Sequence, residues 1–276
     1  MQLLLLRIED RLMKVNSEQL KEIQLEILNE VHSFCEKNEI KYYLTYGTLL
    51  GAIRHKGYIP WDDDIDICMP RPDYEKFAKS FNKNQSRYKF VSYEIDKKFL
   101  YRYGKVMDTT TRVIEDARIN YELGINIDIF PIDGINDDLS LLKKQIMLRR
   151  FIDFKVVKIS KRNSFVNNLV LFIGRIIVSP VTVGFLVNKM ITNAKSYSYE
   201  EAQKVCCVVM GTKLNKPVPK EYFAERKLVD FENFKFYVPI GYDAYLRSVF
   251  GDYMKLPPED KRATHHLFTA YIKEEK

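Results

Sequence analysis

Cysteine and tryptophan are scarce in this 276-residue chain, which has four cysteines and a single tryptophan, Trp61. No two cysteines form a C-x-x-C pair. Cys206 and Cys207 are adjacent, which suits neither a shared metal nor a mutual disulfide. We therefore expect Cys35, Cys68, Cys206 and Cys207 to be reduced, mostly buried thiols of a cytosolic protein.

Uninterrupted apolar runs of membrane-spanning length are also missing. The stretch "MQLLLLRIEDRLMK" has four consecutive leucines before Arg7, too few for the apolar region of a signal peptide, so we expect no export signal. The most apolar segment, "FVNNLVLFIGRIIVSPVTVGFLV", is a poor transmembrane span because it is interrupted by Asn167, Asn168, Arg175 and Pro180.

Acidic residues are fewer than basic ones, giving a net charge of +7 and a pI near 9.0. An apolar content of 46% with 29% charged residues indicates a globular chain rather than a disordered one. A basic chain suits nucleic acid, an anionic membrane face or phosphate-bearing small molecules. Nucleic acid is disfavoured because the basic residues lie beside an apolar stretch and are not interleaved with stacking aromatics.

Helical and strand-like patterns alternate in the first half of the chain. Apolar residues recur every three or four positions over residues 17–38, which predicts a helix with Ser17 as its N-cap. Short helices are predicted over residues 47–54 and 71–81. Strands are predicted at "IKYYLTY", "DIDICM", "YKFVSYEI", "FLYRYGKVMD", "TRVIED" and "INIDIF". The pattern predicts an α+β fold with a mixed sheet.

The composition changes after Gly134. Residues 137–160 are predicted to be helical, and eight basic residues lie between Lys143 and Arg162 with Asp153 as the only acid among them. The apolar segment that follows has two interpretations. Either it forms a helical hairpin buried beneath the sheet, or it is a surface that enters the membrane interface beside anionic headgroups.

Four aspartates crowd into five positions of "PWDDDIDICM". Alternation with isoleucine places Asp64 and Asp66 on one side of the predicted strand, about 7 Å apart along the backbone. Two carboxylates on one face suit Mg²⁺ or Mn²⁺, which also relieves their repulsion. Asp62 and Asp63 are either supporting, loop-capping residues or direct metal ligands.

A third carboxylate, Asp128 in "INIDIFP", has the same isoleucine-flanked context, and it joins the first two if the two strands are neighbours. Asp133, in "PIDG", is predicted to be a turn residue. The turn Gly47-Thr48 before a helix is predicted to offer free backbone N–H groups and a hydroxyl to a phosphate.

Arg54 and Lys56 are predicted to supply positive charge to the same phosphates. Carboxylates on a strand together with a phosphate turn are typical of metal-assisted phosphoryl transfer. Asp128 would complete a second metal site or accept the proton of the attacking hydroxyl.

These motifs resemble the LicD family, a phosphotransferase group related to fukutin and fukutin-related protein. The resemblance runs through "YGTLLGAIRHKGYIPWDDDIDICMPRPDYEKF" and "INIDIFPIDG", and it returns at "FENFKFYVPIGYDAYLRSVFGDYMKLPPEDKRATHH". It implies a nucleotidyltransferase-like core flanked by helices, a divalent cation and a CDP-activated donor. Carried over by motif, the resemblance implies that Asp64 and Asp66 are the metal-binding pair and that Asp128 is the third carboxylate. It places Gly47, Thr48 and Arg54 in the turn that binds the donor phosphate.

Bacterial members of the family typically transfer phosphocholine from CDP-choline to lipooligosaccharide or teichoic acid. The resemblance therefore implies a phosphocholine transferase that releases CMP. The enzyme is expected in the cytoplasm, peripheral to the inner face of the cell membrane. An alternative enzymatic function uses CDP-ribitol or CDP-glycerol as the donor, and a non-enzymatic alternative is a Ca²⁺-binding, membrane-associated scaffold.

The expected domains are a catalytic core (1–136), a helical region facing membrane or acceptor (137–215), and a segment completing the catalytic domain (216–276).

Aromatic faces recognise the quaternary ammonium of choline, so Trp61, Tyr101 and Tyr103 are candidate contacts for choline or the base, with ordinary packing as the alternative. Four further candidates for contact with the donor or the acceptor lie in the C-terminal motif: Arg247, Arg262, His265 and His266.

Overall fold

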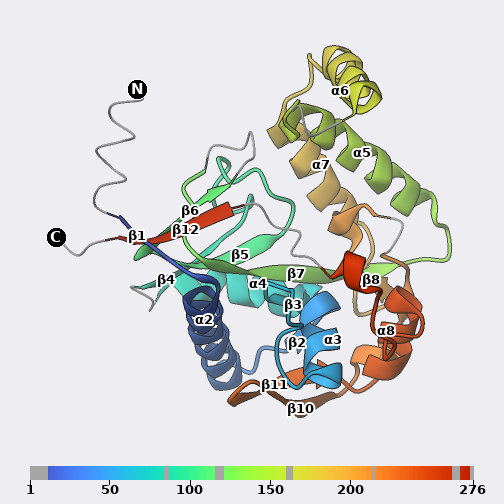
Figure 1. Ribbon diagram of the computed structural model, residues 1–276. Coiled ribbons are helices and arrows are strands. Elements are labelled where there is room, and N and C mark those ends of the chain that lie inside the picture. The colour runs from blue at the N-terminus through green and yellow to red at the C-terminus, as the bar shows by residue number, and fades with distance from the viewer. Residues whose placement is uncertain are drawn as a thin grey trace.

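The computed structural model describes residues 12–83, 87–115, 121–159, 164–212, 215–262 and 268–273 (Figure 1). Its α-helices are α2 (Ser17–Lys37), α3 (Tyr46–Arg54), α4 (Arg71–Ser80), α5 (Ser140–Val156), α6 (Phe165–Ile177), α7 (Val183–Ala194) and α8 (Tyr242–Phe250). Its strands are β1 (Leu12–Lys14), β2 (Tyr43–Leu44), β3 (Asp66–Pro70), β4 (Tyr88–Val91), β5 (Gly104–Asp108), β6 (Thr111–Glu115), β7 (Asn126–Ile135), β8 (Lys204–Cys206), β9 (Val218–Pro219), β10 (Arg226–Phe231), β11 (Phe234–Pro239) and β12 (Phe268–Lys273).

A seven-stranded sheet runs through the centre of the molecule in the order β2-β3-β7-β5-β4, and β8 and β9 extend it beside the C-terminal half of β7. β3 and β7 are parallel, whereas β2, β5 and β8 are antiparallel to the strands they pair with. A sheet with both kinds of pairing, together with separate helical layers, confirms the predicted α+β fold with a mixed sheet.

The helix α2 lies along one side of this sheet (Figure 1). Its N-cap is Asn16 and not the predicted Ser17, which is already the first helical residue. The Asn16 side chain accepts the Gln19 N–H at 2.9 Å, and the Gln19 side chain accepts the Asn16 N–H at 3.0 Å, completing a capping box. Near the other end of α2, the Phe34 ring packs edge-on against Phe77 of α4.

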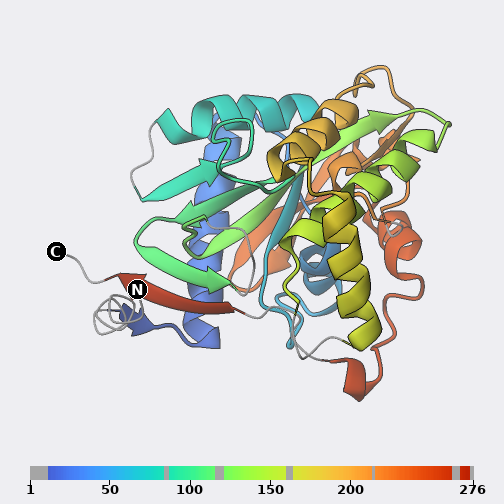
Figure 2. The same ribbon diagram turned by 90° about the horizontal axis from the view of Figure 1, so that it is seen from above.

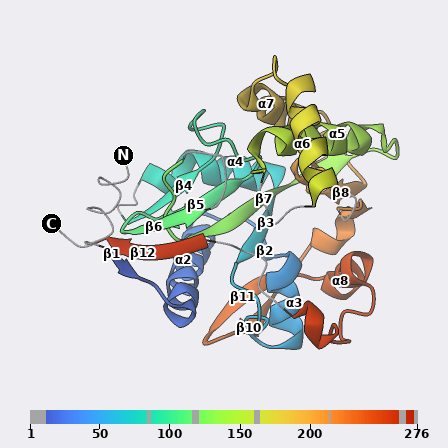
Figure 3. The same ribbon diagram turned by 45° about the horizontal axis from the view of Figure 1, so that its top comes forward.

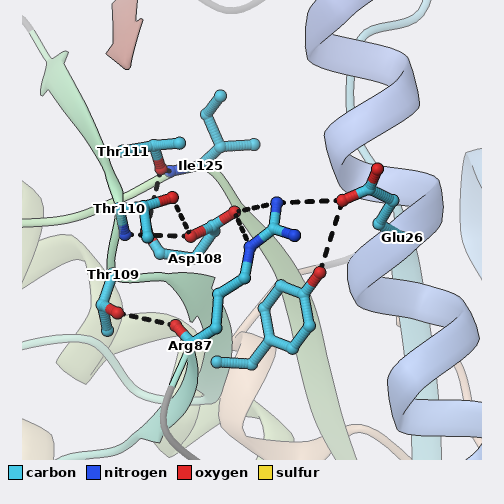
Figure 4. A network of polar contacts seen from close by, with 8 residues as sticks. Glu26, Arg87, Asp108, Thr109, Thr110, Thr111 and Ile125 are labelled. Atoms are coloured by element: carbon cyan, nitrogen blue, oxygen red, sulfur yellow. Dashed lines mark hydrogen bonds and ion pairs between the residues drawn. The ribbon is translucent and has the colours of Figure 1, made fainter. Parts of the chain in front are cut away.

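A network of charged and hydroxyl groups ties α2 to the β4–β5 end of the sheet (Figure 4). Arg87 contacts the fully buried Asp108 at 2.8 Å and Glu26 of α2 at 2.9 Å. Asp108 also accepts from the backbone N–H and the hydroxyl of Thr110, at 2.9 and 2.7 Å. Four donor contacts to one carboxylate therefore connect the turn after β5 to α2 through Arg87.

C-terminal segments pack back against the first half of the chain. β12 pairs between β1 and β6 in a separate three-stranded sheet, visible at the left of Figure 3. The hairpin of β10 and β11 turns at Glu232, whose carboxylate accepts the Tyr58 N–H at 2.9 Å. This contact holds the loop that leads into the aspartate motif.

The helices α5, α6 and α7 form a lobe beside the sheet, and α6 stands farthest from the sheet (Figures 1 and 2). α7 buries Leu186, Val187 and Met190 in the main core, whereas the buried residue of α6 is Gly174. The predicted helices are confirmed, but the interpretation as a buried hairpin is wrong for α6, because most of its apolar side chains face outward. The predicted burial of all four cysteines is confirmed, and burial raises the pKa of each thiol.

Candidate active site

Two aspartates on neighbouring parallel strands form the centre of the site. Asp66 is the first residue of β3, and the register of β3 and β7 places it directly beside Asp128. Directly paired residues of a parallel ladder project to the same face, so both carboxylates lie on one side of the sheet. The strand register thus brings together two of the three predicted carboxylates.

The start of α3 fixes the position of Asp66. The Asp66 N–H donates to the Thr48 hydroxyl at 2.8 Å, and the Asp66 carbonyl accepts the Thr45 N–H at 3.1 Å. Thr48 is buried, and its oxygen already receives a hydrogen bond. Thr48 therefore acts as a positioning residue for the Asp66 backbone, and its predicted contact with a phosphate stays a prediction.

A buried lysine from the antiparallel neighbour strand completes the charged centre. Lys105 of β5 pairs with Asp128 in the sheet register, and its ammonium donates to the Asp128 carboxylate at 2.5 Å and to the Asn126 side chain at 2.9 Å. Sequence reasoning missed Lys105. The available signal was a lysine within the apolar strand pattern "YGKVMD", whose side chain needs a partner when the strand is buried.

Negative charge is concentrated around Asp66. Burial raises the pKa of Asp66 well above its ordinary value, and the nearby carboxylates of Asp64, Asp128 and Asp62 raise it further, while the Lys105 ammonium opposes them. Each ionised neighbour makes a further negative charge less favourable, and burial removes the water that would screen it. A cation placed between these carboxylates would relieve that repulsion.

Asp64 reaches this centre from the loop before β3 and not from the strand itself, which begins at Asp66. It lines a cavity of about 70 Å³ together with Asp63, Lys105 and Asp128. In the part of the chain that the structure describes, no three His, Cys, Asp or Glu side chains form a ready-made metal cluster. Mg²⁺ commonly binds through one or two carboxylates and completes its shell with water and substrate phosphates, so the Asp66–Asp128 pair fits such an ion.

A buried glutamine of α2 holds the two segments that carry the carboxylates. The Gln24 side-chain amide donates to the Asp63 carbonyl at 3.1 Å and to the Asn126 carbonyl at 3.4 Å, and its oxygen accepts from the Tyr58 hydroxyl at 3.3 Å. Gln24 was also missed, although a polar residue on the apolar face of the predicted helix was a visible signal.

The predicted phosphate turn faces a carboxylate. A Cβ added to Gly47 would lie 2.7 Å from the Asp62 carboxylate, so a larger residue here would require the Asp62 side chain to move. The preceding Tyr46 has a φ of 45°, in the left-handed region that non-glycine residues seldom adopt. Since the Asp62 charge already faces the start of α3, a donor phosphate at this turn would require a cation or movement of Asp62.

The two predicted phosphate-binding cations are not at the start of α3. Arg54 ends the helix, about 10 Å from Gly47 at 1.5 Å per residue. Its guanidinium donates to the Tyr253 carbonyl at 2.7 Å and to the His55 ring at 2.9 Å, and burial lowers the pKa of Arg54. Lys56 is exposed beyond the same end. The structure does not bring either side chain to the Gly47-Thr48 turn.

The three candidate aromatics occupy two places. The Lys105 ammonium lies over the rings of Tyr101 and Tyr103, at 5.5 and 5.8 Å from their centroids. Burial, and then the nearby Asp128 charge, raise the pKa of Tyr103. Trp61 lies with Asp62 along a separate cavity of about 440 Å³, and the Arg262 guanidinium sits 5.5 Å from its ring centroid.

Other predicted residues lie farther from the carboxylates or outside the described residues. Arg247 is exposed and forms an ion pair with Asp243 one helical turn away, at 2.9 Å. His265 and His266 fall outside the described residues. The prediction that Asp133 is a turn residue is wrong, because it lies within β7, is buried, and accepts a hydrogen bond from Arg71 at 2.6 Å.

Comparisons with known proteins give this chain a family. The family model described as "LicD/FKTN/FKRP, nucleotidyltransferase domain" matches residues 39–170. The lipopolysaccharide cholinephosphotransferase LicD of Haemophilus influenzae is 33% identical over 256 residues, covering 90% of this chain and 95% of that protein. An uncharacterized protein of Rickettsia typhi is 44% identical over 54 residues, covering 20% of this chain and 18% of its own length.

Proposed function

Because this chain belongs to the LicD family, we propose that it transfers phosphocholine from CDP-choline to a sugar hydroxyl of a cell-envelope glycan. The similarity to a lipopolysaccharide cholinephosphotransferase along 90% of the chain supports this reaction. The observation that carries the proposal is the Asp66–Asp128 pair, two adjacent carboxylates on one sheet face. We further propose that the catalytic core has a nucleotidyltransferase-like fold. The proposed acceptor is a lipopolysaccharide or a teichoic acid at the cytoplasmic membrane face.

In this proposal Asp66 and Asp128, with Asp64, hold Mg²⁺ or Mn²⁺. When bound, the ion would neutralise charge on the donor diphosphate and lower the pKa of the attacking hydroxyl. Lys105 keeps Asp128 oriented through its 2.5 Å contact, and Thr48 fixes the Asp66 backbone. Gln24 holds the Asp63 loop and the start of β7 in register.

The transfer proceeds by attack of a sugar hydroxyl oxygen on the phosphorus that carries choline. A new P–O bond forms to the sugar while the P–O bond to CMP breaks, and CMP leaves with the bonding electrons. The hydroxyl proton passes to a carboxylate of this group. Asp128, which Lys105 holds in position, is the proton acceptor if Asp64 and Asp66 alone hold the ion. The products are CMP and a phosphocholine-substituted glycan.

The direct test is acceptor-dependent release of CMP from CDP-choline by the purified full chain with Mg²⁺. We expect release with lipopolysaccharide or teichoic acid that lacks phosphocholine, and its loss in Asp66→Asn. Asp137→Asn is the matched control, because the Asp137 side chain is 86% exposed and pairs with the surface residue Lys204. No CMP above the acceptor-free blank, across several acceptors, would overturn the choline donor.

A polyol donor such as CDP-ribitol or CDP-glycerol is the second candidate. It is favoured by the Lys105 ammonium, which already lies over the rings of Tyr101 and Tyr103, where a choline headgroup would otherwise bind. A thermal-shift panel of CDP conjugates separates the two, since a ligand that binds the native state raises the melting midpoint. The larger midpoint shift identifies the donor.

A further inference from the structure

The helix α6 exposes most of its large apolar side chains. Its contact with the protein is narrow: Gly174 packs against the Phe154 ring, and Arg175 donates to the carbonyls of Phe154 and Val157 at 3.2 and 3.0 Å. On the same side, Leu171 is half-buried and Val178, at the end of the helix, is buried. A surface helix normally places most of its apolar side chains against the protein, whereas α6 turns the majority of them outward.

The outer face of α6 consists of large apolar side chains that are 41–81% exposed: Phe165, Val166, Leu169, Val170, Phe172, Ile173, Ile176 and Ile177. We name these eight side chains the α6 face. They recur on one side of the helix, and exposed apolar side chains gathered in this way mark a binding site for a partner or a membrane.

Positive charge is concentrated in the same lobe. Residues 140–194 contain ten Lys and Arg and one acidic residue, so the other 221 residues hold 34 basic and 36 acidic ones. The whole net positive charge of the chain therefore belongs to the segment that presents the α6 face. Lys143, Lys144, Arg150 and Lys158 are exposed on or directly after α5.

We propose that the α5–α7 lobe binds an anionic lipid bilayer, with α6 lying in the plane of the interface and the α6 face buried at the acyl boundary. Apolar residues beside a basic surface are the chemistry that anionic lipid recognises. A second copy of the chain fits less well, because pairing two α6 faces would bring two strongly basic lobes together. The inference does not depend on which group the enzyme transfers.

The helix lies on the bilayer and does not cross it. Thirteen residues span about 20 Å, less than the roughly 30 Å hydrocarbon thickness. In the described ranges, none of the helices combines the length and the apolar character that a membrane span requires.

The test is flotation of the full chain with vesicles of phosphatidylcholine alone or with 30% phosphatidylglycerol. We expect cofloating with the anionic vesicles that weakens severalfold in high salt. The variant Phe172→Ser/Ile176→Ser/Ile177→Ser should lose at least tenfold in vesicle affinity. The matched control, Ile95→Ser/Leu228→Ser/Ile240→Ser, removes apolar residues of 44–48% exposure elsewhere and should bind as the parent does.

Both variants should melt like the parent chain, since the replaced side chains are exposed. Absence of parent-chain flotation at low salt, or equal flotation of the α6 variant, would overturn the proposal. Self-association that needs the same three side chains, without vesicle binding, would assign the α6 face to a second copy instead. CMP release is measured in a separate assay. A failure of the membrane-binding proposal can therefore be distinguished from a failure of the proposed transfer reaction.

Discussion

Asp108 and Asp66 lie on strands of the same sheet but have opposite electrostatic surroundings. The Asp108 carboxylate receives four donor contacts, two from Arg87 and two from Thr110 (Figure 4). The charges nearest Asp66 are mainly other carboxylates, and Lys105 makes its ion pair with Asp128. A buried carboxylate whose charge is met by donors of the protein stabilises the fold, whereas a group of carboxylates that repel one another suits a ligand that brings positive charge.

The largest expected effect is on turnover when the carboxylate pair is broken. Asp66→Asn should lower the rate of CMP release by about a thousandfold or more, since metal-assisted charge neutralisation contributes several kcal/mol. Its melting midpoint should stay within a few degrees of the parent value or rise, because the substitution removes repulsion. Steady-state kinetics and calorimetry on the same preparation check both. A comparable fall in stability and activity would favour the calcium-scaffold alternative.

The same substitution at Asp108 should have the opposite profile. Asp108→Asn removes the charge that Arg87 and Thr110 contact, so we expect a loss of about 2–3 kcal/mol in the free energy of unfolding. CMP release per folded molecule should change little. Urea titration gives the stability, and initial rates below the transition give the activity. A large drop in turnover with unchanged stability would place Asp108 in the active site.

A smaller effect is expected at the hydroxyl that positions Asp66. Thr48→Val removes the acceptor for the Asp66 N–H and should cost about 1–2 kcal/mol in unfolding free energy, with a modest fall in kcat. Thr48→Ser keeps the acceptor and serves as the matched control. If the valine and serine variants behave alike, the hydrogen bond does not position Asp66.

The smallest effect is a pH dependence of stability in metal-free protein. Because burial and neighbouring carboxylates raise the pKa of Asp66 in the folded state, the fold keeps this proton to a higher pH than the unfolded chain does. The resulting stabilisation is complete below the ordinary Asp pKa of about 3.9 and is lost as pH rises through the raised pKa.

In EDTA, the parent chain should therefore lose stability relative to Asp66→Asn as the pH is raised, and Mg²⁺ should reduce the difference. Unfolding titrations of both proteins across the pH range measure it. A difference that stays constant with pH would contradict the raised pKa.

Local patterns predicted most elements between residues 17 and 156, because periodicity and capping act over a few residues. The helix at residues 17–37 and the strand at "INIDIF" were found this way, and the shared isoleucine context pointed to Asp66 and Asp128. The Asp128–Lys105 contact was not found, because it depends on a register between strands that local sequence does not encode. Asp133 was misread because "PIDG" carries a local turn signal that sheet pairing overrides.

Other errors arose from three-dimensional placement. Arg54 is close to Gly47 in sequence, but the rise of α3 separates them, and Tyr253 from the C-terminal segment binds the guanidinium. The apolar run of α6 left burial and a membrane-facing surface both open, because hydrophobicity alone does not tell whether protein or another phase covers it.

The parallel pairing of β3 with β7 also has a consequence for folding. The hairpin of β10 and β11 closes through a short local turn, whereas the Asp66–Asp128 register joins residues 62 positions apart. Closing so long a loop loses chain entropy before the new contacts repay it, so nonlocal pairing is slow. We therefore expect the chain to acquire its hairpins and helices early and the Asp66–Asp128 pair late, so that a partly folded or newly synthesised chain lacks the carboxylate pair proposed to hold the metal.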